Sequence, residues 1–332
     1  MKISKGLFIL VGIFLIPLFL LVNVQTSAAN EGSINFPERE IRIVVAAAPG
    51  GKSDICCRIF AKRWEEVLGT KIMVENRMGA AGVIGGQYIA SSKPDGYNLG
   101  WFSGRGCIPE IYAEALSYTS KDIEPLFQII FGIVAFCVRA DAPWADLNEF
   151  IAYAKDNPGF QYGHTGRGAG PHLQAEIFAK EAGIILKDVP FEGDAGSLIG
   201  LLSGDVDLAV FDFPVTVEQY KAGKIRILAV YSLERMNILP EVPTFIEQGI
   251  DLPLSVLSFN CIAVPAGVPE EVKNIIIETG RQVINDPQIL AKLTEDLGYY
   301  VEFSTGDKFK AMLDEYKEVV GNFMKDLGLY QE

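Results

Sequence analysis

Residues 41–54, IRIVVAAAPGGKSD, decide how this sequence is interpreted. An apolar run over 41–46 stops at Pro49-Gly50-Gly51, and apolar residues then recur every three to five positions over 55–68. This order predicts a strand, a glycine turn and a helix. Backbone N–H groups at the start of a helix carry partial positive charge, so the turn predicts a seat for an anion.

The same turn permits a second interpretation, a phosphate-binding loop. Residues 46–53 fit a relaxed form of that motif, in which the lysine reaches phosphates and the serine binds magnesium. The apolar strand that ends at Asp212 would then be the strand whose carboxylate contacts the magnesium ion. Alanine in place of the first glycine, and Pro49 within the loop, weaken this interpretation. The other possibility is a turn that grips a carboxylate, with Lys52 as a nearby surface charge.

The N-terminus predicts export. Lys2 and Lys5 precede an apolar stretch over 7–24, and small residues follow over 26–29. This is the pattern of a secretory signal peptide over residues 1–29, and an uncleaved anchor is the alternative. We therefore expect a periplasmic or other extracytoplasmic protein. Such a protein meets little ATP, which again disfavours the phosphate-loop interpretation.

Length and charge limit the class of protein. The chain has 332 residues and a formal net charge of −13. About 300 residues remain after the predicted signal, which favours two domains. An acidic chain without a basic run is a poor nucleic-acid binder, so we expect no nucleic-acid partner, and a monomer. Any anion must be caught by local groups, because the overall field repels it.

Cysteines and histidines give no metal-site pattern. The two histidines, His164 and His172, are too few for an ordinary metal site, and we expect no metal and no cofactor. The five cysteines lack zinc spacing, and packing as small hydrophobes is the expected state for them. One disulfide of unknown pairing is the alternative. The cysteines are Cys56, Cys57, Cys107, Cys137 and Cys261.

Strand-like and helical patterns alternate along the rest of the chain. This alternation predicts an α/β architecture with mainly parallel sheets. Strand-like runs lie near 41–47, 71–75, 97–102, 126–138, 206–211, 226–231 and 259–264. Helical patterns lie near 53–68, 83–92, 108–116, 146–156, 172–182, 195–203, 214–222, 269–285, 287–297 and 305–327.

Three glycine-rich turns follow strand-like runs. The second covers residues 102–106 and contains Arg105, and the third covers 163–170, after a short strand-like run over 160–162, and contains Arg167. Parallel sheets bind ligands at the carboxyl ends of their strands, so the three turns are predicted to converge on one cleft. For any single turn, a simple chain reversal is an equal explanation. A basic residue in each turn, Lys52 in the first, favours a site.

Short motifs in a fixed order resemble the solute-binding receptors of tripartite tricarboxylate transporters. Each motif alone is weak, but the series is specific and runs from residue 36 to the C-terminus. The motifs are FPEREIRIVV at 36–45, APGGKSD at 48–54, VENR at 74–77, GAAG at 79–82, PDGY at 94–97, GRG at 166–168, PHL at 171–173, LLSGDVD at 201–207, AGKIRILAV at 222–230, LPEVPT at 239–244 and VPAGVP at 264–269.

The resemblance implies a fold and a function. It implies a two-lobed, type II-like periplasmic-binding-protein fold with parallel-rich sheets flanked by helices and a ligand cleft between the lobes. The chain would cross between lobes twice, with residues 36–137 plus 262–332 in one lobe and 138–261 in the other. The implied function is capture of a di- or tricarboxylate or related organic acid for the membrane components of a transporter, without catalysis.

The resemblance also implies the ligand-binding residues. Main-chain groups of the first and third turns would hold a ligand carboxylate, and loops from both lobes would face the cleft. The predicted residues are Ala48, Pro49, Gly50, Gly51, Lys52, Ser53, Asp54, Ser103, Gly104, Arg105, Thr165, Gly166, Arg167, Gly168, Ala169, His172, Phe191, Glu192, Gly193 and Asp212.

Departures from the family pattern leave the ligand open. Lys52 and Arg167 stand where small or polar residues are usual, and Ala169 replaces a frequent hydroxyl. Because the turn amides can already hold one carboxylate, Lys52, Arg105 and Arg167 are surplus, and we hypothesise that the ligand carries at least two negative charges, or one carboxylate and a strongly polar far end. A secreted hydrolase using Ser53 or Ser103 remains an alternative, although no Gly-x-Ser-x-Gly elbow is present. A further alternative is a receptor that passes its signal to a sensor partner, because such a receptor has the same sequence pattern as a transport receptor.

Overall fold

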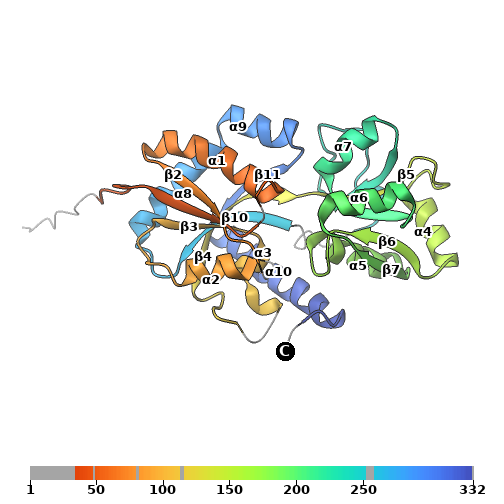
Figure 1. Cartoon of the computed structure of the whole chain (residues 1–332), viewed down its shortest axis with the longest axis horizontal. Helices are drawn as coiled ribbons and strands as arrows, with labels where there is room; N and C mark the ends of the chain where they lie inside the picture. Colours follow the sequence, from red (N-terminus) through yellow and green to blue (C-terminus); the bar gives the residue numbers. More distant parts are fainter. Residues whose placement is uncertain (1–33, 48, 80–81, 113–115, 252–257, 331–332) are drawn as a thin grey trace, which may run out of the picture. The chain divides into compact units, whose positions relative to one another are not determined.

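The computed structural model describes residues 34–330, apart from 48, 80–81, 113–115 and 252–257. Two sheets with helices packed against them organise this part of the chain (Figure 1). The strands are β1 (Ile41–Val45), β2 (Ile72–Asn76), β3 (Asn98–Phe102), β4 (Ile123–Gly132), β5 (Val134–Arg139), β6 (Phe160–His164), β7 (Leu186–Pro190), β8 (Leu208–Asp212), β9 (Ile225–Val230), β10 (Ser258–Pro265) and β11 (Tyr300–Thr305).

The helices differ widely in length. Short helical segments are η2 (Pro109–Ile111), η3 (Ile246–Gln248) and η5 (Lys292–Asp296). The α-helices are α1 (Lys52–Leu68), α2 (Val83–Ala90), α3 (Gly104–Cys107), α4 (Leu147–Asp156), α5 (Gly170–Ala182), α6 (Gly193–Ser203), α7 (Phe213–Lys221), α8 (Glu270–Ile284), α9 (Pro287–Ala291) and α10 (Gly306–Asp326).

The first sheet has the strand order β11-β4-β10-β3-β1-β2. Strand β1 is parallel to β2 and β3, with Ile43 opposite Val74 on one side and Leu99 on the other. Strand β10 is antiparallel to β3 and β4, and β11 is antiparallel to β4. The carboxyl ends of β1 and β3 therefore lie at one edge of the sheet, where the first two glycine turns leave it.

The second sheet has the order β7-β6-β8-β5-β9. Strand β6 is parallel to β7 and β8, whereas β5 is antiparallel to β8 and β9. The parallel trio β7-β6-β8 places the third glycine turn, after β6, beside the ends of β7 and β8. The α/β class predicted from the alternating patterns is confirmed.

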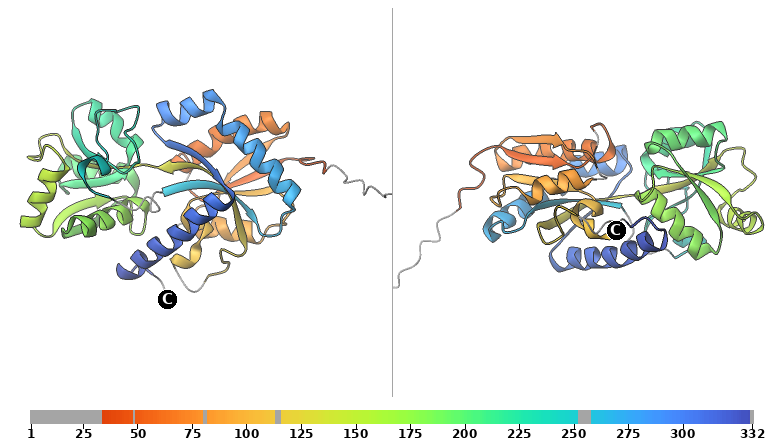
Figure 2. Two further views of the ribbon diagram at one scale, coloured as in Figure 1. Left: turned by 180° about the vertical axis from the view of Figure 1, so that it is seen from behind. Right: turned by 60° about the horizontal axis from the view of Figure 1, so that its bottom comes forward.

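Side-chain alternation in β1 explains why helices cover both faces of the first sheet. Ile43 belongs to an apolar cluster with Phe60 of α1 and Ile276 of α8. Its neighbour Val44 points to the opposite face and belongs to a cluster with Ile89 of α2. Figures 1 and 2 show α1 and α8 on one side of this sheet and α2 and α10 on the other. A strand buried on both faces reads as a continuous apolar run, as β1 does.

The chain changes sheets between β4 and β5. Strand β4 ends at Gly132 and β5 begins at Val134, and on the return β10 begins at Ser258, which pairs with Gly132. These changes lie a few residues before the lobe boundaries predicted at 137/138 and 261/262. The boundaries remain a prediction.

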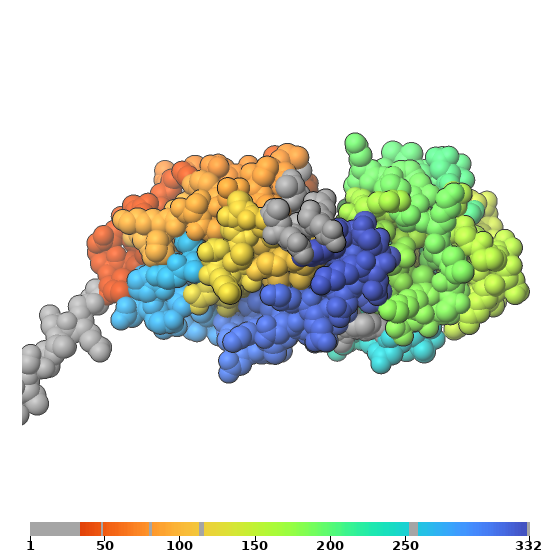
Figure 3. All heavy atoms as spheres, turned by 90° about the horizontal axis from the view of Figure 1, so that it is seen from below, coloured from red at the N-terminus to blue at the C-terminus, as the bar shows by residue number. Residues whose placement is uncertain are grey.

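Helix α10 packs on the first sheet and also contacts the helix that follows the third turn. The ammonium of Lys180 on α5 lies 3.8 Å from a carboxylate oxygen of Asp326 and 4.8 Å from the ring centre of Phe323. Figure 3 shows the blue C-terminal segment directly beside the green one. Met324 of α10 also reaches the third turn, because a Cβ at Gly168 would lie 3.6 Å from its terminal carbon.

Predicted and observed elements differ where the sequence patterns are short. The predicted run 126–138 is two strands, because the chain passes into the other sheet at Ile133. Strands β7 and β11 are half-exposed edge strands with a weak apolar alternation, and the patterns missed them. In place of one helix over 108–116, the described residues form α3 and η2, because Pro109 has no N–H with which to extend α3.

Neither the predicted signal peptide nor Ala48 can be assessed, since both lie outside the described residues. Within the part of the chain that is described, no helix is both long and apolar enough to cross a membrane. All five cysteines are buried and unbridged in the structure.

Candidate ligand-binding site

The first glycine turn is held together from within. Gly51 is the extended N-cap residue of α1, and no side chain caps this helix. The Asp54 carboxylate accepts hydrogen bonds from the Gly50 amide at 2.8 Å, from Asn76 at 2.9 Å and from Arg58 at 2.9 Å. Burial opposes the charge, but these hydrogen bonds outweigh it and hold the pKa of Asp54 below its usual value. Asp54 therefore stabilises the turn.

Lys52, the first residue of α1, forms an ion pair between the two sheets. Its ammonium lies 2.8 Å from a carboxylate oxygen of Asp212 at the end of β8, and the two side chains are only 18% and 14% exposed. The amide of Asp212 donates to Asp194 at 2.9 Å. Burial and the neighbouring charge of Asp212 raise the pKa of Asp194 to about 6. The positive charge of Lys52 is thus matched inside the chain.

Gly132 explains how Lys52 reaches across. A Cβ at position 132 would lie 2.5 Å from the Lys52 ammonium and 3.2 Å from Ser258 Cβ. The lysine side chain therefore passes over backbone that only glycine leaves open. Beside it, the Ser53 hydroxyl accepts a hydrogen bond from buried Asn260 of β10 at 3.1 Å. The first turn is thereby tied to the crossover strands.

A cavity of about 380 Å³ lies between the second and third glycine turns. Its described lining residues include two arginines and no acidic side chain, in a protein with a net charge of −13. Residues from β3–α3, from the turn before α5, from β10 and from α10 form its walls. They are Ser103, Gly104, Arg105, Tyr112, Thr165, Gly166, Arg167, Gly168, Ala169, Gly170, Leu173, Ser258 and Tyr316.

Arg105 is held in this cavity by neutral groups. Its guanidinium carbon lies 3.8 Å from the centre of the Tyr112 ring, and one N–H donates to the Gly168 carbonyl at 3.3 Å. The Tyr112 hydroxyl in turn lies 3.0 Å from that of Tyr316. Across the described ranges, no carboxylate lies within ion-pair distance of Arg105. Among the described residues, Arg105 therefore has no acidic partner at the cavity wall.

Arg167 lies in the same cavity but is paired. Its Nε donates to Asp188 at 2.9 Å and its Nη2 at 3.2 Å, a two-bond pairing with one carboxylate of β7. The side chain is 59% exposed. Arg167 thus resembles Lys52, whose charge is also matched by an internal acid, and differs from Arg105.

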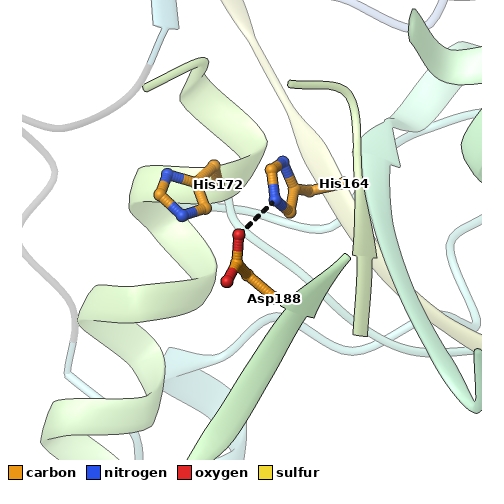
Figure 4. A group of neighbouring side chains, drawn as sticks. All are labelled: His164, His172 and Asp188. Atoms are coloured by element: carbon orange, nitrogen blue, oxygen red, sulfur yellow. Dashed lines mark hydrogen bonds and ion pairs between the residues drawn. The ribbon is translucent and has the colours of Figure 1, made fainter. Parts of the chain in front are cut away.

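Two buried histidines shape the third turn. The amides of Gly166 and Gly168 donate to Nδ1 of His164 and of His172, each at 3.1 Å. Figure 4 shows His164 at the end of β6, His172 on α5 and Asp188 on β7 pointing toward one another. Burial lowers the pKa of both histidines, that of His172 to about 4. Both rings are therefore neutral at pH 7, and they hold the turn through its amides.

The same three side chains have the composition of a metal site, because their ligand atoms lie within 4.8 Å of one another. The hydrogen bonds argue against that use. Each Nδ1 accepts an amide proton, so the neutral ring carries its own proton on Nε2. Nε2 of His164 then faces Asp188 at 3.4 Å as a donor, without a lone pair for a cation. Arg167 already neutralises Asp188. The arrangement suits a structural network.

Known proteins with this sequence pattern identify the family. Residues 56–329 match the tripartite tricarboxylate transporter family receptor. This chain belongs to that family. A Cupriavidus necator protein named "UPF0065 protein in gbd 5'region" is 33% identical over 301 residues, covering 84% of this chain and 88% of the relative.

Solved structures agree with the family. A TctC solute binding protein from Polaromonas, without ligand, has a TM-score of 0.75 and 26% identity, and the match covers 88% of this chain and 99% of that one. An R. palustris protein solved with adipate has a TM-score of 0.77 and 25% identity, over 90% and 100% of the chains. The predicted receptor family and its two-lobed binding-protein fold are confirmed, and the phosphate-loop alternative gains no support.

The predicted site residues of this receptor fall into three groups. The second and third turns meet in the cavity, which contains Ser103, Gly104, Arg105 and 165–169. The first turn, 49–54, lies with Asp212 beside that cavity and not in its lining. The third group consists of residues 191–193 and His172, and it lies outside the lining. There the ring of Phe191 packs against Gly200 of α6, Glu192 is the N-cap residue of α6, and Gly193 begins that helix.

Sequence reasoning missed several side chains of the site. Tyr112 and Tyr316 reach the cavity from segments interpreted as helices with an apolar core face, and a tyrosine on such a stripe is normally a core residue. Asp188 lies on β7, which was not predicted. The position of His164, at the end of a strand before a glycine turn, was a sequence signal for a site residue. That its ring accepts a hydrogen bond from a turn amide depends on the geometry of the turn.

Proposed function

We propose that this receptor captures a small organic carboxylate outside the cytoplasm, with one carboxylate group bound at Arg105. The observation that carries the proposal is the unequal pairing of three basic side chains. Lys52 and Arg167 are matched by Asp212 and Asp188, whereas Arg105 faces the cavity and pairs with no acid of the described part of the chain. A planar guanidinium binds a carboxylate through two parallel hydrogen bonds, and such charge-assisted bonds are the strong ones.

The start of α5 supports the same placement. Its N-cap residue, Ala169, makes no side-chain capping bond, and Pro171 occupies the first turn. A helix of this length favours negative charge at its N-terminus. The hydroxyls of Ser103, Thr165 and Ser258 also line the cavity and suit the far end of a polar ligand.

The size and the relatives favour a dicarboxylate. The cavity volume of about 380 Å³ lies at the small end of the ~300–1,000 Å³ typical of ligand sites. The R. palustris relative was solved with adipate, a six-carbon dicarboxylate. We infer that a second carboxylate of the ligand lies toward Arg167, whose remaining N–H groups are not used by Asp188.

The receptor acts by binding and release. It transfers the acid unchanged to membrane components of a tripartite transporter, and it acts as a monomer. Two features argue against hydrolysis by Ser53 with His164 or His172 as its base. The Ser53 hydroxyl already accepts from Asn260, and Nδ1 of each histidine accepts from a turn amide. Neither pair has the nucleophile–base geometry of covalent catalysis.

Calorimetric titration with a ladder of straight-chain acids tests the proposal. Malonate, succinate, glutarate, adipate and pimelate are compared with hexanoate, which matches adipate in carbon number and has one carboxylate. We expect a dicarboxylate to bind at least tenfold more tightly than hexanoate, and the recovered ligand to be chemically unchanged. Absence of binding for every acid, or accumulation of product beyond one equivalent of protein, would overturn the proposal.

A further inference from the structure

Two of the five thiols lie in contact in the core of the first sheet. The sulfur atoms of Cys107 and Cys261 are 3.3 Å apart, although the residues are 154 positions apart in sequence. Cys107 ends α3, and Cys261 lies in the middle of β10. Both side chains are buried. Across the described ranges, none of the other three cysteines has its sulfur in contact with another cysteine sulfur.

Backbone register produces this contact. In the β3–β10 pair, Phe102 lies opposite Cys261. The chain leaves β3 after Phe102 and folds into α3, whose amide of Gly106 bonds back to the Ser103 carbonyl at 3.0 Å. This turn returns Cys107 over the partner strand, next to Cys261. The approach of the two sulfurs therefore follows from paired backbone and not from a mobile side chain.

We propose that Cys107 and Cys261 form a disulfide bond in the exported protein. A disulfide needs its sulfurs about 2.05 Å apart, so the two must close by roughly 1.2 Å. The proposal rests on the export included in the proposed function, because disulfides persist in oxidising compartments outside the cytoplasm. It does not depend on which ligand the receptor binds.

The reaction is an exchange with a dithiol–disulfide oxidant, either a protein or glutathione disulfide. One cysteine thiolate attacks the oxidant's disulfide and releases the first oxidant thiol. The second cysteine thiolate attacks the mixed disulfide and releases the second thiol. Two electrons pass from the cysteines to the oxidant, and their two protons are transferred with them. Burial raises the pKa of Cys261, so thiolate is scarce in the folded chain and the bond must form during folding.

The bond would fix two walls of the ligand cavity. Arg105 lies two residues before Cys107, and Ser258 lies three residues before Cys261. The closed loop contains the whole second sheet and both changes of sheet. A disulfide across such a long loop restricts the unfolded chain strongly. The two thiols therefore have a structural use that packing as small hydrophobes does not give them.

Refolding of the full chain tests the proposal without any ligand. The reduced, unfolded chain is refolded in a mixture of oxidised and reduced glutathione, denatured again, alkylated and weighed. We expect three alkylated thiols on the wild-type chain and a peptide pair joining Cys107 to Cys261. Cys261→Ala should carry four alkyl groups. The matched control Cys137→Ala, another fully buried thiol, should carry two, because the bond is retained.

A second measurement covers the possibility that a variant fails to fold. The wild-type protein is heated with and without reductant, and the bond should raise Tm by about 5–10 °C. The double variant Cys107→Ala, Cys261→Ala should show no reductant effect. Five alkylated wild-type thiols with an unchanged Tm on reduction, or a bond through another cysteine, would overturn the proposal. Absence of acid binding would leave it unaffected and would count against the proposed function alone.

Discussion

The first glycine turn resembles in sequence the two turns that line the cavity, but the structures around their basic residues differ. Each offers a helix start and a basic side chain. At the first turn, the Lys52 ammonium is already 2.8 Å from Asp212, and the pair is largely buried. In the cavity, Arg105 is held by a tyrosine ring and a carbonyl, both neutral. A basic residue in a glycine turn therefore indicates a ligand only where no internal acid reaches it.

This difference assigns separate roles to the two regions. The first turn joins elements of the two sheets through a charge pair. In the proposed function, the charge of Arg105 at the cavity wall recognises the anion. We propose that a ligand closes the receptor by binding at Arg105 while the Lys52–Asp212 pair persists.

The largest expected effect is at Arg105. Arg105→Met keeps the length of the side chain and its contact with Tyr112 but removes the charge. We expect adipate affinity to fall about 100-fold, or roughly 2.7 kcal/mol, because the ligand carboxylate loses its charged partner in a shielded site. Calorimetry measures the change. Arg281→Met is the matched control, since Arg281 also lies over an aromatic ring, at 4.5 Å from the centre of Phe303, but outside the cavity. An equal loss in both variants would refute the role of Arg105.

Acid should lower the stability of the third turn by protonating His172. The pKa of His172 in the folded chain, about 4, is below the unfolded value of about 6.5. The unfolded chain therefore takes up the proton first, so the stabilising contribution is complete above pH 6.5 and is lost as pH falls toward 4. His172→Asn retains an acceptor for the Gly168 amide and does not titrate.

The measurement is urea unfolding of wild type and His172→Asn at pH 7.5 and 4.5. The wild-type advantage in free energy of unfolding should shrink by on the order of 2 kcal/mol at the lower pH. Taking the difference between the two proteins cancels the titration of distant Asp194, whereas His164 and Asp188 lie against His172 and contribute to the difference as part of the same network. A difference that stays constant between the two pH values contradicts the assigned role.

The Lys52–Asp212 pair should be cooperative. Lys52→Met or Asp212→Asn leaves a largely buried charge without its partner, and each should lower the free energy of unfolding by about 1–3 kcal/mol. The double variant should recover part of that loss, with a coupling energy of about 1.5 kcal/mol. Urea unfolding of the four proteins completes the cycle. A coupling energy near zero would mean that the pair is only a surface contact.

The smallest expected effect is at Arg167. Arg167→Met should weaken adipate binding about fivefold, near 1 kcal/mol, and hexanoate binding by less, because Asp188 already takes two of the guanidinium hydrogen bonds. The same calorimetric titrations measure both ligands. If Arg167→Met weakens adipate as strongly as Arg105→Met does, internal pairing does not predict which arginine binds the ligand.

The fold was largely predictable because its signals are local. The apolar run of β1, its glycine turn and the periodic face of α1 occur within thirty residues of sequence, and the family motifs follow in order. The patterns missed strands β7 and β11 because their side chains are mostly half-exposed or exposed and give no clear apolar alternation. The sequence predicted that the second and third turns converge, and residues 103–105 and 165–170 of these turns line one cavity.

The pairing state of each site residue was not predictable. Whether a basic side chain meets an acid depends on contacts such as that between positions 52 and 212, which are 160 residues apart. Two acids that neutralise predicted site residues, Asp212 and Asp188, come from the second sheet. Only Asp212 was considered at all, because the strand that carries Asp188 has no clear sequence pattern. Long-range charge pairing therefore limits site prediction from sequence more than the fold does.

The most direct test of the account is a crystal structure of the receptor with adipate. The account predicts one ligand carboxylate within hydrogen-bond distance of the Arg105 guanidinium, with the Lys52 ammonium still bonded to Asp212. A ligand carboxylate bonded to Lys52, with Asp212 displaced and Arg105 free of ligand, would contradict it.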